Sequence, residues 1–236
     1  MIKEGLARLL WNKEWDRLPA LVDQEPATVR KLFSLLFDRE PLLAWRAVLG
    51  FGVLARHRPD PVRRALSRLA FALNDEATIC AWMNAPAVGE MAAARPALTR
   101  DVVRIIVHYF EDEETCRGTN RNVRVLCAAL WAVGRVGSRD PELVREVWPT
   151  LSGFTRDREA EVRAHAWWAV GAIRRGTPDG GWSLPEFEEV ETAADPVAVF
   201  DPETAEFVTQ SVERFARQAL EESPRFEERA ASDDKG

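Results

Sequence analysis

The sequence predicts an all-α chain, an α-solenoid of about four stacked helix pairs with helical caps at both ends. A small–apolar–Gly–any–apolar pattern recurs four times at similar intervals, which is typical of stacked repeats. Amphipathic segments, with apolar residues three and four apart, lie between the copies. No alternating apolar–polar run is long enough to predict a sheet. The 236 residues are 46% hydrophobic, enough for a continuous core.

The repeated pattern marks one helix of each predicted pair. Its glycines are Gly52, Gly89, Gly134 and Gly171, spaced by 37, 45 and 37 residues. The segments that contain them are 42–54, 78–91, 123–136 and 162–173. A glycine at a fixed position on a helix lets neighbouring helices approach closely. Residues 111–120 explain the longer middle interval and are expected to form a loop.

The segments between these copies are expected to form the other helix of each pair. They are 26–37, 61–73, 97–110 and 141–154. Pro26, Pro61 and Pro141 stand at or near three of the starts, where a missing backbone N–H has little effect.

The two ends of the chain complete the predicted organisation. Residues 3–23 are expected to form a helical cap, and 204–220 a C-terminal helix. The connection 175–203 is long and irregular, and its segment 197–200 is expected to lie extended along the body. The predicted parts are the solenoid with its cap over 1–175, an acidic connection with a packing helix over 176–221, and a disordered tail over 222–236.

The last copy carries the pattern most fully, with Asp157, Val162-Arg163, Ala166 and the run 169–173. This pattern resembles HEAT repeats, especially the short HEAT-like type of phycobilisome lyases. The segments WMNAPAVGEM and LWAVGRVG also resemble an uncharacterised group of bacterial HEAT-like proteins. The resemblance covers 26–175. It implies that the second helix of each pair lines a concave surface, and it implies no particular chemistry.

The second copy departs most from the others. Where the other copies have alanine five residues before the glycine, it has Asn84, and it has Pro86 where two others have tryptophan. Proline inside a helix costs about 3 kcal/mol, so a helix is expected to begin here, with Asn84 as its N-cap. The free backbone groups of that start, beside Trp82, indicate a polar-ligand or anion site. The alternative is a packing irregularity with Trp82 in the core.

Glu90 and Arg135 each follow the glycine of their copy, on neighbouring repeats, and are expected to form an ion pair. The pair either fixes the geometry of the repeats or forms the polar floor of a concave pocket, with Trp131 and Trp168 as its aromatic walls. The candidate partner- or ligand-binding residues are Trp82, Asn84, Glu90, Trp131, Arg135, His165 and Trp168.

Charge is distributed unevenly along the chain. Residues 176–236 hold 5 Lys+Arg and 16 Asp+Glu, a balance of −11, and 1–175 hold the other 27 and 22, a balance of +5; together they give −6. The acidic segment is expected to cover part of the body, with 186–206 limiting access to the concave face. A basic excess this small argues against nucleic acid as the partner.

Familiar catalytic and metal-binding patterns are absent from the sequence. The three cysteines, Cys80, Cys116 and Cys127, form no CxxC pair and are expected to be buried free thiols. No nucleophile elbow, phosphate loop or dinucleotide fingerprint occurs. No catalytic residue, metal site or cofactor is therefore predicted.

The sequence thus predicts a cytoplasmic, non-enzymatic scaffold that binds a protein partner through its concave face. The alternative is a small-ligand-binding protein or an enzyme, with a concave pocket around Trp82, Glu90, Arg135 and Trp168. No run approaches the roughly 18 apolar residues of a membrane span, and the N-terminus lacks the apolar centre of a signal peptide. The oligomeric state and the partner are left open.

Overall fold

The computed structural model describes residues 2–73, 82–111, 116–119, 121–177, 181–185 and 196–221. Within these ranges the chain is mostly helical, as predicted, with one two-stranded sheet. The α-helices are α1 (Ile2–Trp11), α2 (Arg17–Gln24), α3 (Thr28–Leu35), α4 (Pro41–His57), α5 (Pro59–Leu73), α6 (Asn84–Ala94), α7 (Pro96–Thr99), α8 (Val103–Tyr109), α9 (Val123–Gly137), α10 (Trp148–Gly153), α11 (Ala160–Arg175) and α12 (Val212–Glu221). Two 3₁₀ segments are η3 (Pro141–Val144) and η4 (Phe154–Arg156).

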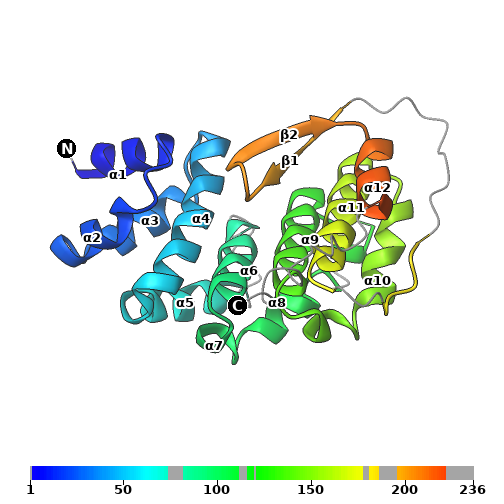
Figure 1. Ribbon diagram of the computed structural model, residues 1–236, viewed down its shortest axis with the longest axis horizontal. Coiled ribbons are helices and arrows are strands. Elements are labelled where there is room, and N and C mark those ends of the chain that lie inside the picture. Colours follow the sequence, from blue (N-terminus) through cyan, green and yellow to red (C-terminus); the bar gives the residue numbers. More distant parts are fainter. Residues whose placement is uncertain are drawn as a thin grey trace, which may run out of the picture.

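The four helices that carry the repeated glycines pack in sequence order: α4 against α6, α6 against α9, and α9 against α11 (Figure 1). Two of the glycines lie directly at these contacts. A Cβ on Gly89 would lie 2.9 Å from the Cα of Ala132, and one on Gly134 would lie 2.9 Å from the Cα of Ala169. Larger residues would push the helices apart, so the predicted close approach is confirmed at both contacts.

The helices that precede this row follow the predicted pattern only in the first half. α3 and α5 occupy the predicted segments 26–37 and 61–73. The segment 97–110 is divided into α7 and α8, and 141–154 is divided into η3, α10 and η4. The expected long helices are therefore absent from these two segments.

The interruption of 141–154 has a local cause. Pro149 lies in the first turn of α10 and has no backbone N–H to continue a helix from η3.

The N-terminal cap is helical, as expected, and consists of α1 and α2. A turn separates them, in which Lys13 takes a positive φ of 58°. Leu6, Leu10 and Leu18 are fully buried, because both helices pack against α4.

The C-terminal part corrects two expectations. The sequence predicts no sheet and a single helix over 204–220, whereas β1 (Val197–Asp201) and β2 (Glu206–Gln210) form an antiparallel hairpin. Only α12 remains of the predicted helix, and it packs against α11. The extended conformation expected for 197–200 is confirmed as part of β1.

The hairpin forms because its turn and its cross-strand contacts are both satisfied. The Asp201 carboxylate accepts from the Thr204 N–H at 3.1 Å, and the Asp201 carbonyl accepts from the Ala205 N–H at 2.9 Å. Phe200 and Phe207 face each other across the strands, with ring centroids 5.6 Å apart. These contacts stabilise strand over helix for a segment whose apolar residues also fit a helical stripe.

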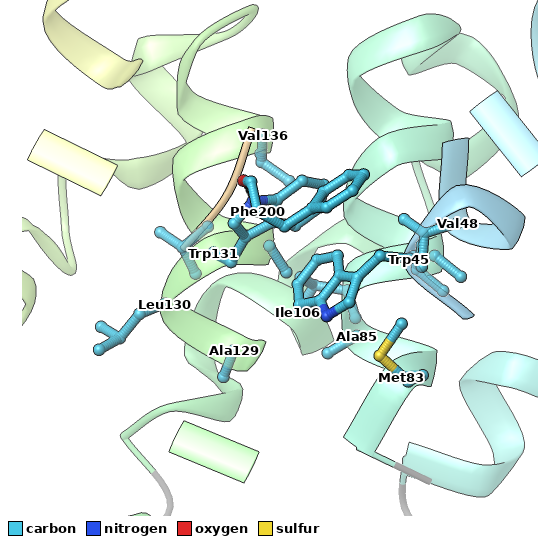
Figure 2. Packing of buried hydrophobic residues seen from close by; sticks show 14 of the residues in the cluster. Trp45, Val48, Met83, Ala85, Ile106, Ala129, Leu130, Trp131, Val136 and Phe200 are labelled. Atoms are coloured by element: carbon cyan, nitrogen blue, oxygen red, sulfur yellow. Dashed lines mark hydrogen bonds between the residues drawn. The ribbon is translucent and has the colours of Figure 1, made fainter. Parts of the chain in front are cut away.

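The hairpin closes over aromatic side chains of the helical row. Phe200 stacks on Trp45 with ring centroids 5.0 Å apart, and the Trp131 Nε1–H donates to the Phe200 carbonyl at 2.8 Å. Figure 2 shows Phe200, Trp45 and Trp131 gathered between the helices. The Arg46 Nε–H donates to the Ala205 carbonyl at 3.1 Å, which fixes the turn end of the hairpin to α4.

Some expectations lie outside the described residues: the acidic segment 186–195, the tail 222–236 and Cys80. Cys116 and Cys127 are buried thiols outside any disulfide, as predicted. None of the described helices combines the length and the apolar character needed to cross a membrane.

Candidate functional site

The second copy of the repeat does begin a helix where the sequence predicts one. α6 starts at Asn84, and Pro86 lies in its first turn, where the absent N–H breaks no hydrogen bond. The cap assignment is corrected: Met83 occupies the N-cap position, and no side chain caps the helix. Asn84 is instead the first helical residue.

The predicted ion pair between Glu90 and Arg135 is confirmed. The Arg135 Nε–H donates to Glu90 Oε2 at 2.6 Å, and Nη2 donates to Oε1 at 3.2 Å. The Glu90 side chain is 9% exposed and that of Arg135 is 21% exposed. Glu90 also fills the space beside Gly52 on α4, where an added Cβ would lie 2.7 Å from the Glu90 Cγ. One carboxylate therefore joins α4, α6 and α9.

Two predicted tryptophans lie beside this pair. Trp131 on α9 stacks on Trp168 of α11, with ring centroids 5.4 Å apart and planes 8° apart. The Arg135 guanidinium lies 5.9 Å from the Trp131 ring centroid, within the range of a cation–π contact. We call Glu90, Trp131, Arg135 and Trp168 the Arg135 cluster.

The members of the Arg135 cluster differ in access. Trp131 is fully buried, because the hairpin covers it and Phe200 accepts its indole hydrogen bond. Trp168 and Arg135 keep part of their surface open. The predicted pocket wall at Trp131 is therefore filled by the chain itself, and the accessible part of the cluster is Trp168 with Arg135.

Trp45 lies between Trp82 and the Arg135 cluster, since its ring centroid is 4.8 Å from that of Trp131. Trp82 is half-buried in an edge-to-face contact with Trp45, with centroids 6.4 Å apart, and the Arg124 guanidinium lies 5.4 Å from its ring centroid. Asn84 is 1% exposed, and neither atom of its side-chain amide has a hydrogen-bond partner. Its positional equivalents, Ala47 among them, are buried too, which places this position inside the packed row.

His165 is a buried residue of α11 rather than a member of the Arg135 cluster. Its Nδ1 lies 2.8 Å from the Glu161 carbonyl one turn earlier, and an Nδ1–H donates to that oxygen. Burial lowers the pKa of the imidazole to about 4, because the charged form loses its hydration. The ring is therefore neutral at pH 7 and serves packing.

Sequence reasoning missed two charged residues that organise the structure. Arg46 is almost fully buried, and it donates to the Trp11 carbonyl at 2.7 Å and to Glu206 at 2.6 Å. Arg121 binds Asp157 through two hydrogen bonds of 2.5 and 2.6 Å. The sequence did contain a signal for Arg46, because it stands inside the apolar run LLAWRAVLG and a buried charge needs hydrogen-bond partners.

The Arg121–Asp157 pair links the loop before α9 to the loop before α11. Burial alone would raise the pKa of Asp157, but its hydrogen bonds with Arg121 and with the Glu159 N–H outweigh burial and lower the pKa. Burial raises the pKa of the Cys127 thiol, so this thiol is not a nucleophile at neutral pH. In the ranges that the structure describes, no three His, Cys, Asp or Glu side chains are grouped to hold a metal ion.

Comparison with known proteins adds no assignment. No protein-family model matches the sequence, and no curated protein matches it significantly.

Proposed function

We propose that this chain is a HEAT-like α-solenoid that binds a protein partner through its concave face, the face built by α4, α6, α9 and α11. The partner docks on the strip of this face that the hairpin leaves uncovered. Arg135 and Trp168 are the anchors of that strip. In this proposal the chain is a non-enzymatic scaffold that binds another protein and catalyses no reaction.

The observation that carries the proposal is the state of these two side chains before any partner arrives. Arg135 is held by two hydrogen bonds to Glu90, and Trp168 is held flat against Trp131. Tryptophan and arginine dominate the binding energy of protein interfaces. Side chains that are already fixed lose little entropy when a partner binds, so more of the contact energy appears as affinity.

The hairpin defines the limits of the strip. Its Phe200 occupies the space over Trp45 and Trp131, so a partner meets β1 and β2 on one side and the exposed parts of Arg135 and Trp168 on the other. A partner that contacts both the helices and the hairpin gains area without displacing either.

The experiment is affinity capture of proteins from the source organism on the full chain, followed by direct binding of the captured protein. Four variants are compared with the wild type. Arg135→Ala and Trp168→Ala remove the anchors. Arg158→Ala and Phe71→Ala remove an equally polar and an equally aromatic side chain from exposed positions elsewhere.

We expect one captured protein to bind the wild type and both control variants, and to bind the two anchor variants at least tenfold more weakly. Thermal unfolding of each variant shows whether it is folded. The proposal is overturned if no protein is captured, or if folded anchor and control variants lose binding equally.

A further inference from the structure

A groove crosses the surface on the side of the molecule away from the hairpin. On one side it is lined by α7 and α8, which lie toward the bottom of Figure 1. On the other side it is lined by the segment that contains η3. Its volume is about 480 Å³. Most of its lining comes from the two interrupted segments, 97–110 and 141–154. Of the residues that line this groove, which we call the α8 groove, those used below are Val103, Val107, Arg100, Arg104, Glu142 and Glu146.

The floor of the α8 groove is apolar. Val103 and Val107 come from α8, and Val136 from the end of α9. These residues are buried, but they form the base of a space open to solvent. An apolar cavity of about 150 Å³ holds one benzene molecule, so this groove has room for about three apolar side chains.

The two walls of the α8 groove carry opposite charges. Arg100 and Arg104, four residues apart, belong to the α7–α8 side, and Glu142 and Glu146, also four apart, belong to the η3 side. The remaining charged lining includes Arg139 and Asp140, which are consecutive and cancel.

The opposed charges do not neutralise one another across the groove. Glu142 pairs with Arg145 on its own side, through Nη2–Oε1 at 2.5 Å. Within the part of the chain that the structure describes, no ion pair joins Arg100 or Arg104 to Glu142 or Glu146. Glu142 thus shares its charge with Arg145, whereas Glu146 has no ion pair within the described residues. The η3 wall keeps a net negative charge opposite Arg100 and Arg104, with the apolar floor between them.

We propose that the α8 groove binds an amphipathic helix of another protein. That helix carries an apolar stripe for the floor, an acidic flank that faces Arg100 and Arg104, and a basic flank that faces Glu142 and Glu146. An apolar stripe between two flanks of opposite charge is complementary to the apolar floor and the two charged walls, which is how grooves bind amphipathic helices. Reversing the direction of the helix in the groove, with its apolar stripe still on the floor, would exchange its two flanks. Each flank would then face a wall of like charge, so the charges also determine the direction in which the helix lies.

This site is separate from the Arg135 cluster, and it does not depend on the function proposed above. Charge complementarity determines the occupant. A helix with two acidic flanks meets Glu142 and Glu146 with like charge, and a helix with two basic flanks meets Arg100 and Arg104 with like charge. Only the helix with one flank of each sign satisfies both walls.

The test uses three fluorescent peptides of 18 residues with the same leucine stripe. One has a glutamate flank and a lysine flank, one has two glutamate flanks, and one has two lysine flanks. Binding to the full chain is measured by fluorescence anisotropy at low salt. We expect the mixed peptide to bind at least tenfold more tightly than either of the others.

A variant of the groove supplies the decisive comparison. The double substitution Glu142→Lys, Glu146→Lys makes both walls basic, and we expect it to transfer the preference to the peptide with two glutamate flanks. The control, Glu203→Lys with Glu213→Lys, makes the same change in net charge at exposed positions elsewhere and should keep the preference for the mixed peptide.

Three results would overturn the assignment. They are equal binding of the three peptides, no binding of any peptide, and the same change of preference in the groove variant and in the control. Light scattering is measured on the same samples. Self-association that the groove variant abolishes would assign the groove to a second copy of this chain instead and so reject the proposal.

Discussion

Glu90 on α6 receives two hydrogen bonds from Arg135 on α9, and its side chain occupies the space that Gly52 leaves open on α4. Three neighbouring helices therefore depend on one nearly buried carboxylate. This dependence makes the pair a structural element as well as the support of a proposed binding surface, and the two roles can be measured separately.

Replacing Glu90 with glutamine should lower the free energy of unfolding by about 1–3 kcal/mol, because Arg135 loses its charged partner while the shape of the side chain is kept. Glu90→Ala should weaken partner binding by a larger free energy than it weakens folding, since it frees Arg135 from its fixed position. Urea unfolding and direct binding measure the two effects. A loss of stability with unchanged binding contradicts the proposed role of the strip.

Gly134→Ala should destabilise the protein by about 1–3 kcal/mol. The added Cβ would lie 2.8 Å from Cζ3 of Trp168 and 2.9 Å from the Cα of Ala169, so helices α9 and α11 must separate. Gly153→Ala is the control, because a Cβ there meets nothing within 4 Å. It should leave stability unchanged or raise it by up to about 1 kcal/mol. Equal thermal unfolding of both variants would mean that α9 and α11 do not need the glycine.

Trp131→Phe should loosen the hairpin. The substitution keeps an aromatic ring but removes the indole N–H, which leaves the Phe200 carbonyl without its 2.8 Å hydrogen bond, at a cost of about 1–3 kcal/mol. Amide hydrogen exchange of 197–210 should accelerate while that of α1 to α3 stays unchanged. In the matched variant Trp148→Phe, the lost bond is to the Ser183 carbonyl, so exchange should accelerate at 181–185 instead. Uniform acceleration in either variant argues against a local anchor.

The free energy of unfolding should decrease as the pH is lowered from 6.5 to 4, because of His165. Its pKa in the folded chain is about 4, below the ordinary value of about 6.5 that applies when the chain unfolds. Between these values the unfolded chain binds a proton that the folded chain does not, so folding weakens as pH falls, by roughly 1.4 kcal/mol per pH unit. The full contribution is present above the unfolded pKa.

The measurement is urea unfolding at pH 7 and pH 5, with the wild type compared with His165→Gln. The wild type should lose about 2 kcal/mol more than the variant does over this interval. Identical pH dependence of the two proteins would show that folding does not lower the pKa of His165.

Deleting 177–236 should increase protease sensitivity and lower stability. The deletion removes the hairpin and α12, and with them the cover over Trp45, Trp131 and the outer side of α11. Limited proteolysis and thermal unfolding of the shortened chain check this. Unchanged behaviour would mean that the C-terminal part does not pack on the body.

The positions of the glycine-bearing helices and of the Glu90–Arg135 pair could be predicted because both follow from the repeat. Equivalent positions on neighbouring copies come together when the copies stack, so counting residues from Gly89 and Gly134 was enough to place the ion pair. The start of α6 was predictable for a local reason, since Pro86 fits only the first turn of a helix.

The hairpin and the access to Trp131 could not be predicted in this way. Phe200 lies 69 residues from Trp131 in the chain, and no periodic pattern relates them. The apolar residues of 204–220 fit a helical stripe, and only the partner strand and the aromatic surface beneath it favour β2. Pro149, by contrast, gave the same local signal as Pro86 for a helix that begins late in 141–154, and sequence reasoning missed it.

The sequence alone thus determined the row of glycine-bearing helices, the charge distribution and the ion pair at its centre, because these depend on residues close in sequence or equivalent by repeat. The tertiary structure alone decided which surfaces of that row remain accessible. Which distant segment covers an apolar face depends on the combined packing of many side chains, and these side chains have no fixed spacing along the chain.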